Sequence, residues 1–331
     1  MRRFTALILM LGLVAAACSS ANERSLTVYS GRSEELVQPL IDQFVEESGI
    51  DVTVRYAGSA DLAATILEEG DASPADVFFA QDPASLGSVA LDGLFAPLPD
   101  SVLETVPPTF SDADGMWVGI SGRARTVVYD STIIDPDTLP PTEDGLTDPE
   151  WAGRVGIAPT NGSFLAFVAA KILLDGEDTT LAWLEGMAAN QAPTFPKNSA
   201  IVTAVNDGQV ESGLVNHYYL LRALAEDPEV VGRNYFFTTP TAGSLVMPAG
   251  IGMLASSTHT DEAEEFIAFL LDTQAQTYFA DETFEYPLVP GVAANSQLPP
   301  LETIPAPELD LSLLATTLDT ATDLVARAGL L

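Results

Sequence analysis

Short apolar runs alternate with amphipathic segments along the first third of the chain. Apolar residues alternate over residues 26–29, recur at helical spacing from Leu36 to Phe44, and alternate again over residues 51–55. A second helical segment ends at Gly70, and a third apolar run covers residues 75–79. Because strands and helices alternate regularly here, the pattern predicts a parallel α/β sheet.

A second α/β unit follows in the middle of the chain. Two strands are predicted before it, at residues 117–120 and 125–129, and a segment rich in proline and acid follows at residues 130–151. The unit itself is predicted to contain strands at residues 154–158 and 213–216 and helices at residues 164–174, 179–189 and 198–205. The repeated alternation indicates a second layered domain of the same class as the first.

The last third returns to the first unit. Strands are predicted at residues 245–247 and 250–254, followed by helices at residues 261–271 and 313–328. We therefore expect two α/β lobes joined by a hinge, with a ligand cleft between them. Lobe one is predicted to contain residues 25–122 and 247–297, and lobe two residues 123–246 and 298–331.

One polar cluster stands out at a predicted strand-to-helix junction. Tyr218 and Tyr219 follow the apolar run at residues 213–216, and helical spacing resumes directly after them. In open α/β sheets this edge is where ligands bind. A phenolate oxygen is a hard anionic donor that suits a hard, highly charged cation. The alternative is a pair of packed tyrosines with locally satisfied hydroxyl groups.

The N-terminus has the pattern of an export signal. Arg2 and Arg3 precede an apolar stretch that is too short to span a membrane, and Cys18 follows three alanines. Residues 1–17 are therefore predicted to be a lipoprotein signal peptide, with Cys18 as the lipidated residue and residues 18–24 as a tether. The alternative is an ordinary secretory signal. Either alternative predicts an extracytoplasmic protein.

Composition excludes several classes of function. The formal net charge is −34, with 47 Asp and Glu residues against 13 Lys and Arg residues, so nucleic acid and anionic lipid are repelled. We interpret this charge mainly as a solvated surface suited to a saline habitat. Cys18 is the only cysteine, and His217 and His259 are the only histidines, which argues against a zinc site. A secreted serine hydrolase is a remote alternative, because the sequence contains no Gly-x-Ser-x-Gly motif.

Several segments together resemble one protein family. They are LTVYSGRSEELVQPLIDQFVEESGIDV, SPADVFFAQDPASL, SGRARTVVYD, LTDPEWAGRVGIAPTNGSF, KNSAIVTAVNDGQVESGLVNHYY and TFEYPLVPGV. With them, the chain resembles the ferric-iron-binding proteins of bacterial ABC importers, which are type II periplasmic binding proteins. The resemblance runs from about residue 26 to the C-terminus.

The resemblance implies a set of ligand residues. The paired tyrosine ligands of the family fall on Tyr218 and Tyr219, and the contacts of its companion anion fall on Asn161, Gly162, Asn198 and Asn216. Free N–H groups at a helix start, as expected at Asn161 and Gly162, also favour an anion on physical grounds.

Two positions depart from the family pattern. Ser33 stands where the family often has His, and Gln81 stands where it often has Glu. Since both strong ligands are missing, Ser33 and Gln81 are at most weak contacts. We therefore expect iron(III) to bind together with an anion such as carbonate or citrate, or as a chelate.

Other polar residues are placed with less support. Arg32, Arg123 and Ser59 are candidate anion contacts, and Arg125 is ranked below them; a structural ion pair is the alternative for the arginines. Tyr29, Tyr56 and Tyr286 are expected to be packing or rim residues. Strand alternation points His217 away from Asn216 and Tyr218, so we expect it to be structural.

The sequence therefore predicts a binding protein and not an enzyme. It is expected to be a monomer that captures ferric iron and delivers it to an ABC permease and its ATPase. It is expected to contact the membrane only through its lipid anchor. The alternative within the same class is a protein that binds a small anion or organic acid without metal.

Overall fold

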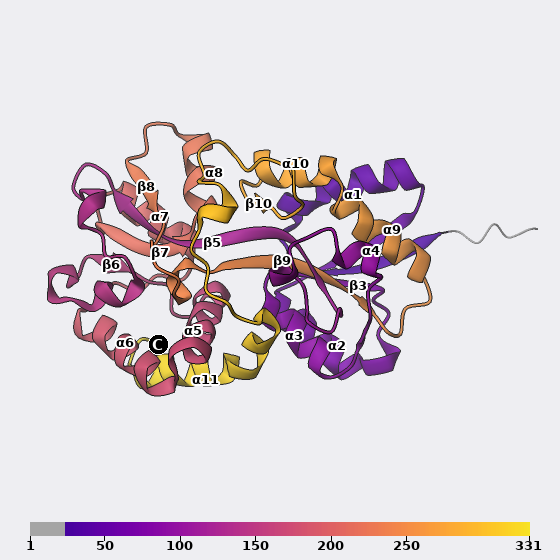
Figure 1. Cartoon of the computed structure of the whole chain (residues 1–331), viewed down its shortest axis with the longest axis horizontal. Coiled ribbons are helices and arrows are strands. Elements are labelled where there is room, and N and C mark those ends of the chain that lie inside the picture. Colours follow the sequence, from indigo (N-terminus) through magenta and orange to yellow (C-terminus); the bar gives the residue numbers. More distant parts are fainter. Residues whose placement is uncertain (1–23) are drawn as a thin grey trace, which may run out of the picture.

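The structure is a computed structural model that describes residues 24–331, and its core is a mixed β-sheet (Figure 1). The strands are β1 (Ser25–Ser30), β2 (Asp51–Tyr56), β3 (Val77–Ala80), β4 (Phe95–Ala96), β5 (Val118–Asp130), β6 (Val155–Gly156), β7 (Ser212–Asn216), β8 (Gly232–Tyr235), β9 (Val246–Leu254) and β10 (Tyr286–Pro287). Their order is β2-β1-β3-β9-β5-β7-β6, while β8 and β10 pair with β5 and β4 pairs with β9. The predicted signal peptide and Cys18 lie outside the described residues.

Helices cover the sheet on both faces. They are α1 (Glu34–Ser48), α2 (Ser59–Glu69), α3 (Pro83–Leu91), α4 (Asp100–Leu103), α5 (Gly162–Asp175), α6 (Glu177–Ala189), α7 (Asn198–Asn206), α8 (Tyr218–Glu226), α9 (Thr260–Leu270), α10 (Thr273–Asp281) and α11 (Leu314–Arg327). Within residues 24–331, none of these helices is long and apolar enough to cross a membrane.

The two long strands β5 and β9 join the two ends of the molecule (Figure 1). Residues 118–124 of β5 pair with β9, whereas residues 125–130 pair with β7 and β8. The predictions of two short strands in each of these regions were wrong, because each region is one continuous strand. The small and polar residues Ser121, Gly122 and Arg123 interrupt the apolar pattern of β5, but the whole strand is buried.

The first half-sheet, which consists of β1–β4, β10 and the adjoining parts of β5 and β9, lies between two layers of helices. Val77 and Phe79 of β3 pack into a cluster with Phe44 of α1 and Phe266 of α9. Phe78, which lies between them in β3, packs into the cluster on the other face, with residues of α2 and α3. This alternation follows from the two-residue period of a strand and explains the continuous apolar run in the sequence.

The second half-sheet, which consists of β6, β7, β8 and the remainder of β5, repeats this arrangement. Val127 and Leu214 share a cluster with residues of α5 and α6, while Val128 and Val215 share a cluster with residues of α7. The terminal helix α11 packs against α5 and also against α3 (Figure 1). Because α11 contacts helices of both half-sheets, the assignment of residues 298–331 to lobe two stays a prediction.

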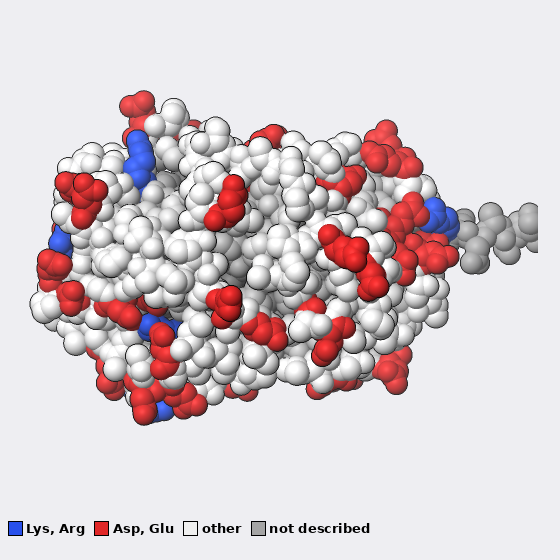
Figure 2. All heavy atoms as spheres, in the orientation of Figure 1, with Lys and Arg blue, Asp and Glu red and all other residues white. Residues whose placement is uncertain are grey.

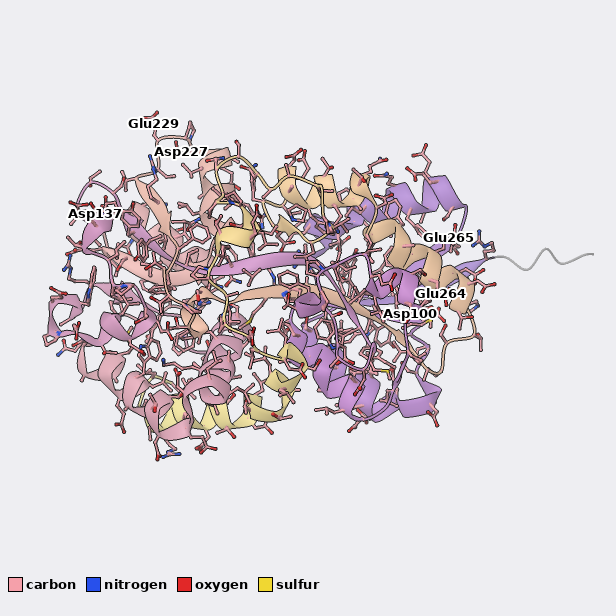
Figure 3. All side chains as sticks on the ribbon, viewed as in Figure 1. Asp100, Asp137, Asp227, Glu229, Glu264 and Glu265 are labelled. Carbon is pink, nitrogen blue, oxygen red and sulfur yellow. The ribbon has the colours of Figure 1, made fainter. Side chains whose placement is uncertain are left out.

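Acidic side chains are spread over the surface. Figure 2 shows many Asp and Glu side chains on the visible face and few Lys and Arg side chains. Figure 3 labels six acidic residues, with Asp137, Asp227 and Glu229 toward one end of the molecule and Asp100, Glu264 and Glu265 toward the other. Acidic side chains at the surface remain hydrated. This agrees with the interpretation of the net charge as a solvated surface.

Candidate ligand-binding cleft

The two tyrosines lie at the junction that the sequence predicts. Strand β7 ends at Asn216 and helix α8 begins at Tyr218. The rings of Tyr218 and Tyr219 are stacked, with centroids 4.2 Å apart and planes inclined by 28°. Both residues line a cavity of about 370 Å³, which we call the tyrosine cavity, and residues of α1, α7 and α8 complete it. The pair is therefore presented to a space between the two half-sheets.

The environment of Tyr218 keeps its hydroxyl group protonated in the absence of a cation. Its side chain is buried, at 3% exposure. Burial and the neighbouring Tyr219 raise the pKa of Tyr218 well above its ordinary value, against the opposing effect of Arg123. A cation that binds Tyr218 must therefore displace a proton, and a highly charged cation stabilises the phenolate most strongly.

His217 anchors the start of α8 and is not directed at the cavity. Its Nδ1 accepts a hydrogen bond from the backbone N–H of Ala124 at 3.1 Å, and its Nε2 lies 2.7 Å from the carbonyl oxygen of Phe284. Burial lowers the pKa of His217 to about 4, so the ring is neutral and Nε2 carries the proton. With both nitrogen atoms bonded to backbone, the residue is structural, as predicted.

A second cavity, which we call the arginine cavity, adjoins the first. It has a volume of about 440 Å³ and shares Gln81 with the tyrosine cavity. Its lining combines side chains of both half-sheets, namely Ser59, Asp61, Gln81, Asp82, Arg123, Arg125, Thr160, Asn161, Ser163, Ala166, Asn216, Leu245 and Met247, together with Gly58, Ala60 and Gly162. The cleft thus has two adjacent compartments, one lined by Tyr218 and Tyr219 and the other by Arg123 and Arg125.

The N-terminus of α5 forms one wall of the arginine cavity. Asn161 caps the helix, and its Oδ1 accepts hydrogen bonds from the N–H and the hydroxyl of Ser163 at 3.1 and 2.7 Å. Asn198 donates to Ser163 Oγ at 2.9 Å and to Asn161 Oδ1 at 3.3 Å, while its own Oδ1 is buried without a partner. The predicted residues Asn161, Gly162 and Asn198 therefore meet at one helix terminus, which favours an anion.

Arg123 and Arg125 form the cationic wall. Arg123 donates to the carbonyl oxygen of Pro248 at 3.3 Å, and Arg125 donates to Ser163 Oγ at 3.3 Å and to Asn216 Oδ1 at 3.4 Å. Both guanidinium groups retain buried nitrogen atoms without hydrogen-bond partners, one in Arg123 and two in Arg125. Burial lowers the pKa of Arg125 to about 9, against the opposing effect of Tyr219.

Arg125, which the sequence analysis ranks below Arg123, lines the same cavity, and its role as an anion contact stays a prediction. Arg123 and Arg125 are two residues apart in β5, so both side chains lie on the same face of the strand. This spacing was the signal that pointed to Arg125 once the strand was known to be continuous. Ser163, Asp61 and Asp82 are further cavity residues that sequence reasoning missed, and their types are too common in loops and helix caps to have been found by pattern alone.

Arg32 has the structural partner that the sequence analysis left open. Its Nη2 lies 2.8 Å from both carboxylate oxygens of Glu285, and both side chains are buried. Ser121 Oγ donates to the same carboxylate at 2.7 Å. Burial opposes ionisation of Glu285, but Arg32 and Arg123 outweigh it, so the pKa of this carboxyl lies below its ordinary value. Arg32 also lines the tyrosine cavity, and its role as an anion contact stays a prediction.

The loops of the first half-sheet bring the weaker candidates to the cleft. Ser33 occupies the N-cap position of α1 and lines the tyrosine cavity without making a side-chain cap. Ser59 Oγ accepts a hydrogen bond from the backbone N–H of Gln81 at 2.8 Å. A Cβ atom at Gly31 would come within 2.0 Å of Ser59 Oγ, so glycine is required where these loops approach.

The three remaining tyrosines considered for the cleft have hydroxyl partners elsewhere. Tyr29 donates to Glu69 at 3.1 Å, Tyr56 donates to Gln38 at 2.7 Å, and Tyr286 donates to the carbonyl oxygen of Pro299 at 3.0 Å. None of the three lines either cavity. Within the part of the chain that the structure describes, no three or more His, Cys, Asp or Glu side chains are arranged to hold a metal ion. A metal in this cleft therefore depends on the paired tyrosines.

Comparison with known proteins identifies the family of this chain. The family model described as bacterial extracellular solute-binding protein matches residues 72–310. The chain belongs to this family. It is also 35% identical over 330 residues to the Fe(3+)-binding periplasmic protein of Serratia marcescens, covering 98% of this chain and 95% of the relative.

Two solved structures of proteins with bound iron have the same fold. Iron-bound HitA from Pseudomonas aeruginosa has a TM-score of 0.86 and 34% identity, with 92% of this chain and 99% of that chain covered. A Trichodesmium protein (IdiA, FutA) in complex with iron and citrate has a TM-score of 0.81 and 27% identity, with the same shares covered.

These matches confirm several predictions. The α/β solute-binding fold and the resemblance to ferric-iron-binding proteins are confirmed. The relatives are iron-binding proteins rather than enzymes, so the prediction that this solute-binding protein is not an enzyme is confirmed as well. The serine hydrolase is thereby excluded, and His217 has no nitrogen atom free to activate a serine.

Proposed function

We propose that this chain is the extracytoplasmic, lipid-anchored solute-binding component of an ABC importer, and that it captures ferric iron together with a companion anion. The observation that carries the proposal is the stacked pair Tyr218 and Tyr219 at the wall of a cavity. Two adjacent phenolates suit iron(III), and the relatives whose names mention iron(III) support the same ion.

The arginine cavity is the proposed site of the companion anion. Arg123 and Arg125 supply positive charge, and the N-terminus of α5 supplies a favourable dipole. The anion then completes the coordination that two phenolates leave open, with Ser33 and Gln81 as weak neutral contacts. Carbonate or citrate fits this description, and citrate has support from the iron and citrate complex of the Trichodesmium protein.

Cleft closure is proposed to follow binding. Tyr218, Tyr219 and Asn161 belong to elements of the second half-sheet, whereas Ser33, Ser59 and Gln81 belong to those of the first. An ion held from one side and contacted from the other favours the closed state, which would then dock on the permease that works with its ATPase. Small-angle scattering with and without iron tests this step, and identical profiles would contradict it.

The test of the iron site is a visible spectrum. Residues 19–331 are expressed without the signal, and iron(III) is added with carbonate or with citrate. The wild type should show a phenolate-to-iron charge-transfer band, and the double variant Tyr218→Phe/Tyr219→Phe should lack it.

A second candidate, binding of an anion or organic acid without metal, is favoured by the unpartnered guanidinium nitrogen atoms of the arginine cavity. No band with either anion, combined with tight binding of the anion alone, would make this alternative the better account.

A further inference from the structure

The tyrosine cavity contains a carboxylate on the wall opposite the tyrosines. Two residues with carboxylate side chains line this cavity, Glu35 and Glu226. Glu226 is the last residue of α8, the same helix that carries the tyrosines, and it lies two helical turns beyond them. Glu35 belongs to the first turn of α1 and therefore approaches the cavity from the first half-sheet. Glu35 and the two tyrosines therefore line the same cavity from different half-sheets.

Glu35 is held close to the tyrosines by an ion pair. Arg222 Nη2 donates to Glu35 Oε1 at 3.2 Å. Arg222 follows Tyr218 by four residues and Tyr219 by three, so all three lie on one face of α8. The ion pair thus brings the Glu35 carboxylate to the face of α8 that carries the phenol pair. The ion pair between Glu35 and Arg222 is weak enough for another cation to replace Arg222, because the two side chains are 67% and 34% exposed.

Charge balance indicates what this carboxylate does. Two phenolates leave a net charge of +1 on a bound iron(III) ion, and a partly closed cleft disfavours an uncompensated charge. One carboxylate ligand makes the protein-bound ion neutral. The charge of the companion anion is then balanced separately by Arg123 and Arg125 in the adjoining cavity.

Other carboxylates near the cleft are bonded to other groups or line the arginine cavity. Glu285 is fully buried and bonded to Arg32 and Ser121. Asp82 caps α3 through the N–H of Ser85 and lines the arginine cavity, as does Asp61. Of these groups, Glu35 is the one that combines an exchangeable partner with a position in the tyrosine cavity.

Building on the proposed ferric site, we infer that Glu35 is a third anionic iron ligand, which exchanges Arg222 for the metal when iron binds. In the metal-free state Arg222 keeps the carboxylate at the cleft. In the loaded state the Glu35 carboxylate of the first half-sheet and the phenolates of the second hold the same ion, which draws the two walls together.

The experiment compares four proteins loaded with iron(III) in the presence of carbonate: the wild type, Glu35→Gln, Glu34→Gln and Arg222→Met. Glu34→Gln is the matched control, because it removes the same charge from the same helical turn but Glu34 does not line the cavity. Two quantities are measured for each protein. They are the EDTA concentration that removes half of the iron and the wavelength of the charge-transfer band.

Glu35→Gln should keep the band but lose half of its iron at an EDTA concentration at least about tenfold lower than the wild type. Its band should move to longer wavelength, because an iron ion with one fewer anionic donor accepts phenolate electrons more easily. Glu34→Gln should match the wild type in both measurements. Arg222→Met should retain iron at least as well as the wild type, because Glu35 no longer has a competing partner.

Two results would overturn the inference while leaving the proposed function intact. If Glu35→Gln matches Glu34→Gln, Glu35 is not a ligand. If Arg222→Met loses iron as easily as Glu35→Gln, the ion pair only holds α1 and α8 together, and Glu35 does not bind the metal. A wild type with no charge-transfer band would instead refute the ferric site and, with it, this inference.

Discussion

His217 holds the tyrosine pair in place, and its removal should cost a predictable amount of stability. In His217→Ala, the N–H of Ala124 and the carbonyl oxygen of Phe284 lose their partners in a buried region. Each unpaired buried group costs about 1–3 kcal/mol, so the free energy of unfolding should fall by about 2–6 kcal/mol. The space left by the ring adds to this cost.

The other histidine of the chain provides the matched control. The side chain of His259 is 40% exposed, and its Nδ1 lies 3.1 Å from Asp76. Because Asp76 keeps its hydrogen bonds from Thr27 and Ser257, His259→Ala should cost only about 1 kcal/mol. The assay is urea unfolding of the metal-free proteins at pH 7, supported by melting temperatures that should fall by about 2 °C per kcal/mol. Equal stabilities of the two variants would refute the anchoring role of His217.

Three further predictions test neighbouring groups. Lys171→Met leaves the buried carboxylate of Glu143 uncompensated and should lower the free energy of unfolding by about 3–5 kcal/mol, measured by urea unfolding. The double variant with Glu143→Gln should recover part of this loss, and no recovery would contradict the pairing. Arg125→Gln should weaken citrate binding to the iron-free protein about tenfold or more, measured by calorimetry, and unchanged affinity would remove Arg125 from the anion site. Because the pKa of Glu285 is lowered in the folded state, its ionisation stabilises the protein above about pH 4.3 and this contribution is lost as the pH falls. The stability gap between the wild type and Glu285→Gln should therefore narrow below about pH 4 in urea unfolding, whereas a constant gap would contradict the assigned charge.

Local patterns were sufficient to predict the elements that carry the tyrosine pair. The apolar run before Asn216 and the helical spacing after Tyr219 placed the end of β7 and the start of α8 correctly. The apolar pattern predicted α5 from residue 164, whereas the helix begins at Gly162, as the family resemblance implied. These features depend on neighbours within a few residues, so the sequence contains their causes directly.

Contacts between distant segments could not be predicted from local sequence patterns. Arg32 and Glu285 are 253 residues apart in the chain, and no periodicity links them. The continuous strand β5 was predicted as two strands, because Ser121 to Arg123 read as a break when the burial of both faces was unknown. The ion pair between Glu35 and Arg222 was missed for the same reason, since it forms only where α1 and α8 approach each other.

The most direct test of the ferric site is a crystal of residues 24–331 grown with iron(III) and citrate, with diffraction measured at the iron absorption edge. The account predicts one strong anomalous peak within bonding distance of the phenolate oxygens of both Tyr218 and Tyr219. Electron density for the anion should lie between that peak and Arg123 and Arg125. A peak away from the two tyrosines, or citrate bound in the arginine cavity without any iron peak, would contradict the account.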